Sequence, residues 1–156
     1  MNSQQTEFVE AFGRFYESFS GARTAGRMLG WLMICEPPER TAAELVEDLG
    51  VSTGSVSTVA RALTSVGLLE RTTFPGKRSS YYRLREHAWL EAMNARMTGI
   101  TELRQMALAA RPLMGDDRPD RVEDLITVTE FFMERWPRLM DDLYEVVSES
   151  TGANHE

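Results

Sequence analysis

The sequence predicts a mainly α-helical fold with one small β-hairpin and long flanking helices, and three observations support this prediction. Apolar residues recur at spacings of three and four through most of the chain, which is typical of amphipathic helices. Residues 68–84 are instead rich in β-branched and aromatic residues and are divided by Pro75-Gly76, a strong turn signal. The 156 residues suffice for one compact domain, or for a small domain with long helices attached.

Two helices are expected at the N-terminus. Residues 5–19 carry an aromatic stripe at helical spacing, which predicts an amphipathic helix. A second helix follows over about 22–35, and Pro37 ends it because proline disfavours helix at its own position and just before it. The residues expected on the buried face of this second helix are Ala25, Met28, Leu29, Leu32 and Met33.

The next segment has the spacing of a helix-turn-helix. Thr41 with Glu44 three residues later is the capping-box pattern that opens a short third helix, and Gly50 stands where such a helix terminates. Ser52 caps a fourth helix over about 53–66. Strands at 68–74 and 80–84 then form a hairpin, so residues 21–86 are expected to form a winged helix-turn-helix domain.

Long helices are expected to fill the C-terminal part. One runs over about 88–110 and is interrupted at Pro112, and a polar loop at 115–119 leads to a last helix over about 121–149, which Pro137 should kink. This last helix is apolar over more than half of its surface, so it should require a partner.

We therefore expect a homodimer in which residues 1–20 and 87–156 form the interface; packing inside a larger monomeric core is the alternative. The candidate dimer contacts are Phe8, Phe12, Leu125, Phe132, Met133, Trp136, Leu139 and Met140.

Charge is segregated along the chain. The net charge is -7, yet residues 52–85 contain six basic residues and one acidic residue, whereas residues 116–156 contain four basic and twelve acidic residues. A locally positive surface on an acidic protein indicates a polyanionic partner. The outer face of the fourth helix is small and polar enough to enter a DNA major groove about 12 Å wide. The candidate DNA contacts are Thr53, Ser55, Ser57, Thr58 and Arg61 on that helix and Arg71, Lys77, Arg78 and Arg83 on the hairpin.

Some of these residues fit an ordinary solvent-facing role as well. A solvated helix face accounts for Ser55, Ser57 and Thr58 about as well as base contact does, and Arg71 can simply face solvent. Lys77 and Arg78 are safer candidates, because a turn tip has little other reason to carry two cations.

Catalytic and metal chemistry are not expected. Two histidines and one cysteine, Cys35, give no metal-ligand spacing and no nucleophile–base pair, so we expect neither an enzyme nor a cofactor. A single thiol cannot form an internal disulfide, which fits a reducing cytoplasm, and a buried apolar role is favoured for Cys35 over redox sensing. No apolar run approaches the roughly 18 residues that span a bilayer. No secretory signal opens the chain, so a cytoplasmic protein is expected.

The stretch RTAAELVEDLGVSTGSVSTVARALTSVGLLERTTFPGKRSSYYRL, residues 40–84, resembles the winged helix of the MarR superfamily of bacterial regulators. RTAGRMLGWLMI at 23–34 and the wing at 75–82 are most similar to the GbsR branch, and the likeness extends over about residues 5–90. The resemblance implies a homodimeric transcriptional regulator that binds a palindromic operator and is released by a small ligand. One departure is that the recognition helix carries a single charge, Arg61, which makes base readout less predictable than phosphate contact.

A ligand site is implied by the resemblance more than by the residues. Aromatic walls at Tyr16, Trp31 and Trp89 could hold a quaternary ammonium group by cation–π contact, as the GbsR likeness implies, although plain core packing explains them too.

The sequence thus predicts a DNA-binding transcriptional regulator, a repressor. The alternative is a winged-helix protein-interaction module, an adaptor or antirepressor, that does not read DNA. Salt separates the two, because phosphate binding weakens steeply as salt rises.

Overall fold

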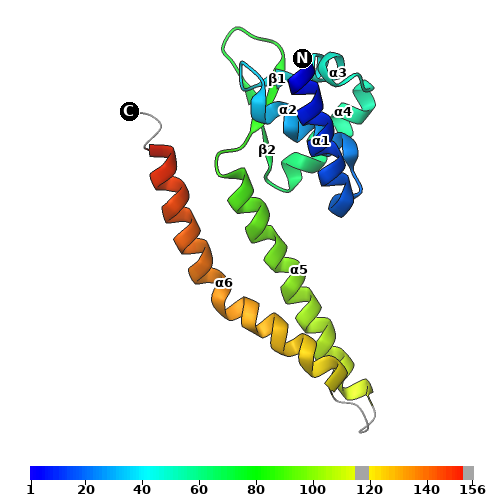
Figure 1. Ribbon diagram of the computed structural model, residues 1–156, viewed down its shortest axis with the longest axis vertical. Coiled ribbons are helices and arrows are strands. Elements are labelled where there is room, and N and C mark those ends of the chain that lie inside the picture. Colours follow the sequence, from blue (N-terminus) through cyan, green and yellow to red (C-terminus); the bar gives the residue numbers. More distant parts are fainter. Residues whose placement is uncertain (115–119, 153–156) are drawn as a thin grey trace. The chain divides into compact units, whose positions relative to one another are not determined.

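The computed structural model describes residues 1–114 and 120–152 and divides into two compact units, Met1–Ala88 and Trp89–Glu156. Most of the described chain is helical, and its one sheet has three antiparallel strands (Figure 1). The predicted fold class is therefore confirmed. The polar loop expected at 115–119 and the side chain of Phe19 in the aromatic stripe lie outside what the structure describes.

Helices α1 (Ser3–Ser20) and α2 (Arg23–Ile34) belong to the first unit and approach each other closely. A Cβ atom added at Gly26 of α2 would lie 2.5 Å from the Cβ of Tyr16 and 2.9 Å from the Cα of Gly13, both in α1. Real Cβ atoms do not approach this closely, so the crossing of the two helices depends on glycine at position 26.

An ion-pair cluster joins the same two helices. The Glu10 carboxylate lies 2.7 Å from the guanidinium of Arg23 and 2.7 Å from that of Arg27. Arg27 also donates a hydrogen bond of 2.7 Å to the backbone carbonyl of Leu49, at the end of the next helix. Hydrogen bonding from Arg23 and the positive charges of both arginines hold the pKa of Glu10 below its ordinary value, against the opposing effect of burial.

The helix-turn-helix forms as the caps predict. Helix α3 (Ala42–Leu49) begins after Thr41, whose hydroxyl accepts a hydrogen bond from the Glu44 amide while the Glu44 carboxylate accepts one from the Thr41 amide. Gly50 ends α3 with a φ of 62°, a left-handed conformation that favours glycine. Helix α4 (Thr53–Ser65) then starts after a short turn.

The sheet has one more strand than the hairpin that the sequence predicts. Strands β2 (Leu69–Thr73) and β3 (Ser80–Leu84) form the expected antiparallel hairpin. A short strand β1 (Arg40–Thr41) pairs with the other edge of β3, so the strand order is β1-β3-β2. Two residues are too few to show the alternation by which a strand is recognised in sequence, and Thr41 is also a helix cap.

The core of the first unit lies between α1, α2, α3, α4 and the sheet. Four of the five residues expected on the buried face of α2 are buried, but Met33 is exposed, because it lies one residue round the helix from the buried Leu32. The side chains that are almost completely buried are Val9, Met28, Leu29, Leu45, Leu49, Val56 and Leu69.

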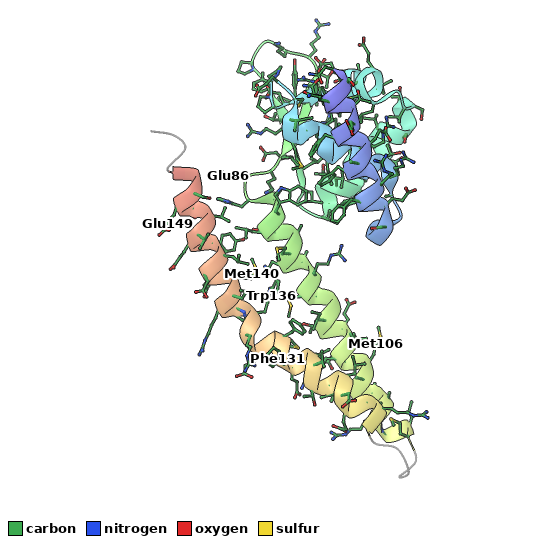
Figure 2. The ribbon with its side chains drawn as sticks, in the orientation of Figure 1. Glu86, Met106, Phe131, Trp136, Met140 and Glu149 are labelled. Carbon is green, nitrogen blue, oxygen red and sulfur yellow. The ribbon has the colours of Figure 1, made fainter. Side chains whose placement is uncertain are left out.

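The second unit consists of long helices. Helix α5 (Ala88–Ala110) leads into a short 3-10 helix, η1 (Arg111–Leu113), where Pro112 interrupts the α-helical pattern as expected. Helix α6 (Asp120–Gly152) contains Pro137 and changes direction along its length (Figure 1). Figure 2 places this change near Trp136, next to the proline that removes a helical hydrogen bond.

Polar side chains of α5 and of the following η1 link to α6 at several levels. The bonds are Arg104 to Glu130 at 2.7 Å, Arg111 to Glu123 at 2.7 Å, Trp136 Nε1 to Asn94 at 3.1 Å and Tyr144 Oη to Glu91 at 2.9 Å. Trp136 and Met140 lie on the side of α6 that faces α5 (Figure 2). The apolar core between these helices is small, since the buried side chains among the described residues of the unit are Leu90, Ala107, Ile126, Thr129 and Met140.

Candidate nucleic-acid interface

The orientation of α4 is set by the side chains on its inner face. Val56, Ala60 and Leu63 are spaced at three and four residues and are all buried. The opposite face is consequently turned to solvent. Of the five residues proposed there, Ser55 is half-buried and the other four are exposed, namely Thr53, Ser57, Thr58 and Arg61.

The start of α4 also offers polar groups. Ser52 caps the helix, with its hydroxyl accepting a hydrogen bond of 3.2 Å from the Ser55 amide. The positive end of the α4 helix dipole and the side chain of the exposed Thr53 therefore both lie at the N-terminus of α4. Within the described residues Arg61 makes no recorded ion pair, so its guanidinium is available to a phosphate or a base edge.

The wing presents its two cations at the tip of a tight turn. The Lys77 amide donates a hydrogen bond of 3.0 Å to the Phe74 carbonyl, and Gly76 has a φ of 76°. Lys77 and Arg78 are both exposed. A turn of this kind holds its tip away from the sheet, which keeps both charges accessible.

Aromatic packing supports this turn from below. The rings of Phe74 and Tyr81 meet edge to face with centroids 5.0 Å apart, and Lys77 Nζ lies 5.8 Å from the centre of the Tyr81 ring. Hydrogen bonds from Thr41 lower the pKa of Glu44 at the start of α3, and the Lys77 charge makes a smaller contribution in the same direction.

The two arginines on the hairpin strands differ in their surroundings. Arg83 stands directly opposite Glu70 across the β2–β3 pair, and its guanidinium forms an ion pair with that carboxylate. Arg71 is exposed and, in the part of the chain that the structure describes, has no recorded ionic partner. The positive charge of Arg83 is therefore partly compensated, whereas that of Arg71 is not.

The pairing of Glu70 with Arg83 was missed by sequence reasoning. The signal in the sequence that pointed to such a pair is that Glu70 is the single acidic residue among residues 52–85. Its partner depends on the register of the hairpin, and the sequence alone does not supply that register.

Among the proposed ligand-binding aromatics, Trp31 has a structural role. This residue is 4% exposed, and its Nε1 donates a hydrogen bond of 2.7 Å to Asp48. The Arg40 guanidinium lies 5.4 Å from the ring centre and donates to the backbone carbonyls of residues 36, 37 and 39. Tyr16 is half-buried beneath α2, and Trp89 is 42% exposed in the second unit.

An open pocket lies in the first unit, beside the base of the wing. Its volume is about 680 Å³. Neither Tyr16 nor Trp31 lines it, and ligand binding by these residues stays a prediction. The lining combines apolar residues with the Glu70–Arg83 ion pair and consists of Leu32, Pro38, Glu70, Arg83, Leu84, Arg85, Glu86 and His87.

Cys35 is 3% exposed, and burial raises the pKa of its thiol. A buried thiol that resists ionisation is a poor nucleophile. Among residues 1–114 and 120–152, no cluster of histidine, cysteine and acidic side chains has the composition of a metal site. No helix in those ranges combines the length and hydropathy that crossing a bilayer requires.

The proposed dimer contacts vary in how far this single chain covers them. Phe8, Phe132 and Leu139 are exposed, and Met140 is buried within the chain. Phe12, Leu125, Met133 and Trp136 are half-buried. The exposed members are those that a second chain would have to cover.

Comparison with known proteins finds similarity to transcriptional regulators. The HTH-type transcriptional regulator MmpR5 of Mycobacterium tuberculosis is 40% identical over 115 residues, which are 74% of this chain and 70% of that protein. A transcriptional regulator of known crystal structure has 34% sequence identity to this chain. The two structures match with a TM-score of 0.69, and the match covers 97% of this chain and 98% of that regulator's chain. Apo MarR from E. coli is 17% identical, with a TM-score of 0.43 over 80% of this chain and 89% of its own. No protein-family model matches the chain.

Proposed function

We propose that this chain, which belongs to the HTH-type transcriptional regulators, is a member of the MarR superfamily that binds double-stranded DNA as a homodimer and represses transcription at a palindromic operator. In this proposal α4 enters the major groove, and the wing tip contacts the phosphate backbone or the adjacent minor groove.

The exposed wing tip is the observation that carries the proposal. Lys77 and Arg78 stand at the end of a turn that aromatic packing supports, on a protein whose net charge is -7. An exposed cationic projection on an otherwise acidic molecule favours a polyanion and would orient the protein on it. Phosphate contacts of this kind supply affinity and register but little sequence information.

Base readout is assigned to α4. Arg61 is its single charged side chain, and it can reach a guanine edge or a phosphate. The exposed hydroxyls of Thr53, Ser57 and Thr58 add short-range hydrogen bonds. We expect specificity to depend on several weak contacts and on the shape of the DNA rather than on one bidentate pair.

The homodimer is supported by the composition of the second unit. Helices of 23 and 33 residues share a small buried core, while large apolar side chains such as Phe131, Phe132 and Val146 are exposed. Exposed apolar stripes on helices this long indicate a missing partner. Two copies would present two α4 helices to half-sites about one DNA turn, roughly 34–36 Å, apart.

Repression and its relief complete the proposal. A dimer seated on an operator excludes other proteins from it, and a small ligand that favours another separation of the two α4 helices would weaken the fit. We retain Tyr16, Trp31 and Trp89 as candidate ligand contacts and the GbsR branch as the candidate subgroup. Both rest on the resemblance of residues 23–34 and 75–82 to that branch.

The test is selection from fragmented genomic DNA with the purified protein at two salt concentrations. We expect a palindromic site whose affinity falls steeply with salt. Replacing Lys77 and Arg78 with alanine should weaken binding to all sequences and reduce the slope of log K against log salt by up to about two. The control is the double variant Arg14→Ala/Arg138→Ala, which removes the same charge from exposed positions outside the interface.

Equal effects of the two double variants would remove the wing from the proposal. Weak, unselective binding to all fragments would instead favour the protein-interaction module. The observation that favours this module is the acidic net charge of the chain.

A further inference from the structure

Lys77, at the tip of the wing, is the single lysine of the chain. Of the 17 basic side chains in the sequence, sixteen are arginines, and the remaining one is Lys77. A guanidinium stays protonated in proteins and is not a nucleophile, whereas a primary amine becomes one when it loses its proton. The single side-chain amine of the protein therefore lies within the proposed DNA interface.

The structure leaves the amine of Lys77 accessible. The residue is exposed, and a Cβ atom added at the preceding Gly76 would meet no other atom within 4 Å, so the space beside the turn is open. Nζ lies 5.8 Å from the centre of the Tyr81 ring, and within the described ranges no ion pair is recorded for it. The Glu44 carboxylate, whose pKa the Lys77 charge helps to lower, is already bonded to the amide and the hydroxyl of Thr41 at 2.7 Å. A reagent can therefore reach the amine without first displacing an ion-pair partner.

The next residue along the chain supplies a charge for an anionic reagent. Arg78 is exposed, and no ion pair is recorded for it in the part of the chain that the structure describes. A guanidinium binds phosphate through a planar fork of N–H donors. In an acyl phosphate, the phosphate group is attached to the carbonyl carbon that an amine attacks. A phosphate held by Arg78 therefore brings the acyl group close to the amine one residue away.

We propose that Lys77 is an acylation site for acyl phosphates, and that its acylation weakens the contact of the wing with DNA. The neutral Nζ attacks the carbonyl carbon, so that a C–N bond forms. The C–O bond to the phosphate group breaks, inorganic phosphate leaves with the electron pair, and the proton of the amine passes to water. The product is a neutral amide, so the wing tip keeps the charge of Arg78 and loses that of Lys77. The effect on DNA rests on the proposed function, and the acylation itself does not.

The composition of the chain confines the loss of charge to the wing. A protein with many lysines would be neutralised by an acyl phosphate over much of its surface. Here the sixteen guanidinium groups do not react, and apart from the α-amino group no other amine competes with Lys77. Losing one phosphate contact should lower DNA affinity by about five- to tenfold at about 0.15 M salt, and reduce the slope of log K against log salt by up to about one.

Peptide mass spectrometry tests the site without DNA. The purified full chain is incubated with acetyl phosphate, and acetylation of Lys77 and of the α-amino group is followed over time. We expect acetylation of Lys77, and Arg78→Gln should slow it by at least about threefold while the rate at the α-amino group stays the same. The control Arg138→Gln removes an exposed arginine of α6 and should change neither rate. An unmodified Lys77, or an equal effect of the two variants on its rate, would overturn the site.

DNA binding tests the consequence. Fluorescence anisotropy with a short random duplex is measured before and after acetyl phosphate treatment, for the parent chain and for Lys77→Arg. Treatment should weaken binding by the parent by about five- to tenfold, to the affinity of untreated Lys77→Gln. The affinity of Lys77→Arg should be the same before and after treatment. An equal loss of affinity in Lys77→Arg would show that acylation elsewhere is responsible, and would overturn the switch at Lys77.

These outcomes separate the acylation from the proposed function. A parent chain that binds DNA equally well with Lys77 acetylated would overturn the switch and leave the proposed function standing. An untreated parent that binds no DNA at any salt concentration would overturn the proposed function and the switch together, and the peptide masses would still decide whether Lys77 is an acylation site.

Discussion

At the scale of single residues, the pairing of Glu70 with Arg83 changes the interpretation of the positive stretch. Arg83 is exposed and Glu70 is half-buried, and their ion pair lines the open pocket beside the wing. The Glu70 carboxylate makes the electrostatic potential around Arg83 less positive, and it fixes the orientation of the Arg83 guanidinium. We infer that Arg83 contributes less to DNA affinity than Arg71, Lys77 or Arg78.

Glu70→Gln should therefore raise affinity for DNA of any sequence. Freeing the Arg83 charge adds about one phosphate contact, so the slope of log K against log salt should steepen by up to about one. Fluorescence anisotropy with a short random duplex at several salt concentrations measures this. The control is Glu149→Gln, which makes the same charge change at an exposed position of α6. If both variants behave alike, Arg83 is not a DNA contact.

At the scale of elements, the contact of α1 with α2 depends on backbone approach. Gly26→Ala should lower the free energy of unfolding by about 1–3 kcal/mol, because the new Cβ would meet the Cβ of Tyr16 at 2.5 Å. Gly99→Ala in α5 is the matched control, since a Cβ there meets no atom within 4 Å. It should stabilise the protein by about 0.5–1 kcal/mol through higher helix propensity. Urea denaturation of both variants measures the difference, and equal destabilisation would contradict the packing argument.

The ion-pair cluster of the same two helices predicts a pH dependence. The pKa of Glu10 is lowered from its ordinary value of 4.5 in the folded state, so the pair stabilises the fold above that pH. The stabilisation is lost as pH falls through the folded-state pKa, because the unfolded chain takes up the proton first. Glu10→Gln should thus cost about 1 kcal/mol near neutral pH and progressively less below pH 4.5.

Unfolding by urea at a series of pH values measures this difference. The control is Glu7→Gln, an exposed residue of the same helix for which the described chain records no ion pair. A cost for Glu10→Gln that does not change with pH would show that the ionised carboxylate is not what joins the helices.

At the scale of the whole molecule, the proposed dimer couples two recognition helices. Inserting about 5 base pairs between the half-sites of the selected operator turns them to opposite faces of the DNA. The dimer then keeps one half-site, so affinity should fall by roughly 100-fold or more. Replacing the spacer sequence at constant length is the control. An insertion without effect would mean that each chain binds alone.

Much of the fold could be predicted from the sequence because its signals are local. The capping box at Thr41, Gly50, and the Pro75-Gly76 turn act within a few residues of one another, so the helix-turn-helix and the hairpin are found at the expected positions. The segregation of charge pointed to the wing for the same reason, since it is a property of one short stretch.

The tertiary structure decided the relations between distant residues. The ion pair of Glu70 with Arg83 joins residues 13 apart, and the hydrogen bond of Trp31 to Asp48 joins residues 17 apart. The pairing of Arg40 with Tyr82 adds a strand that is too short to recognise by itself. Such contacts depend on strand register and helix crossing, which arise when the whole chain packs. The sequence by itself therefore determined which elements form and where positive charge collects, and only the packed chain decided which of those charges remain unpaired.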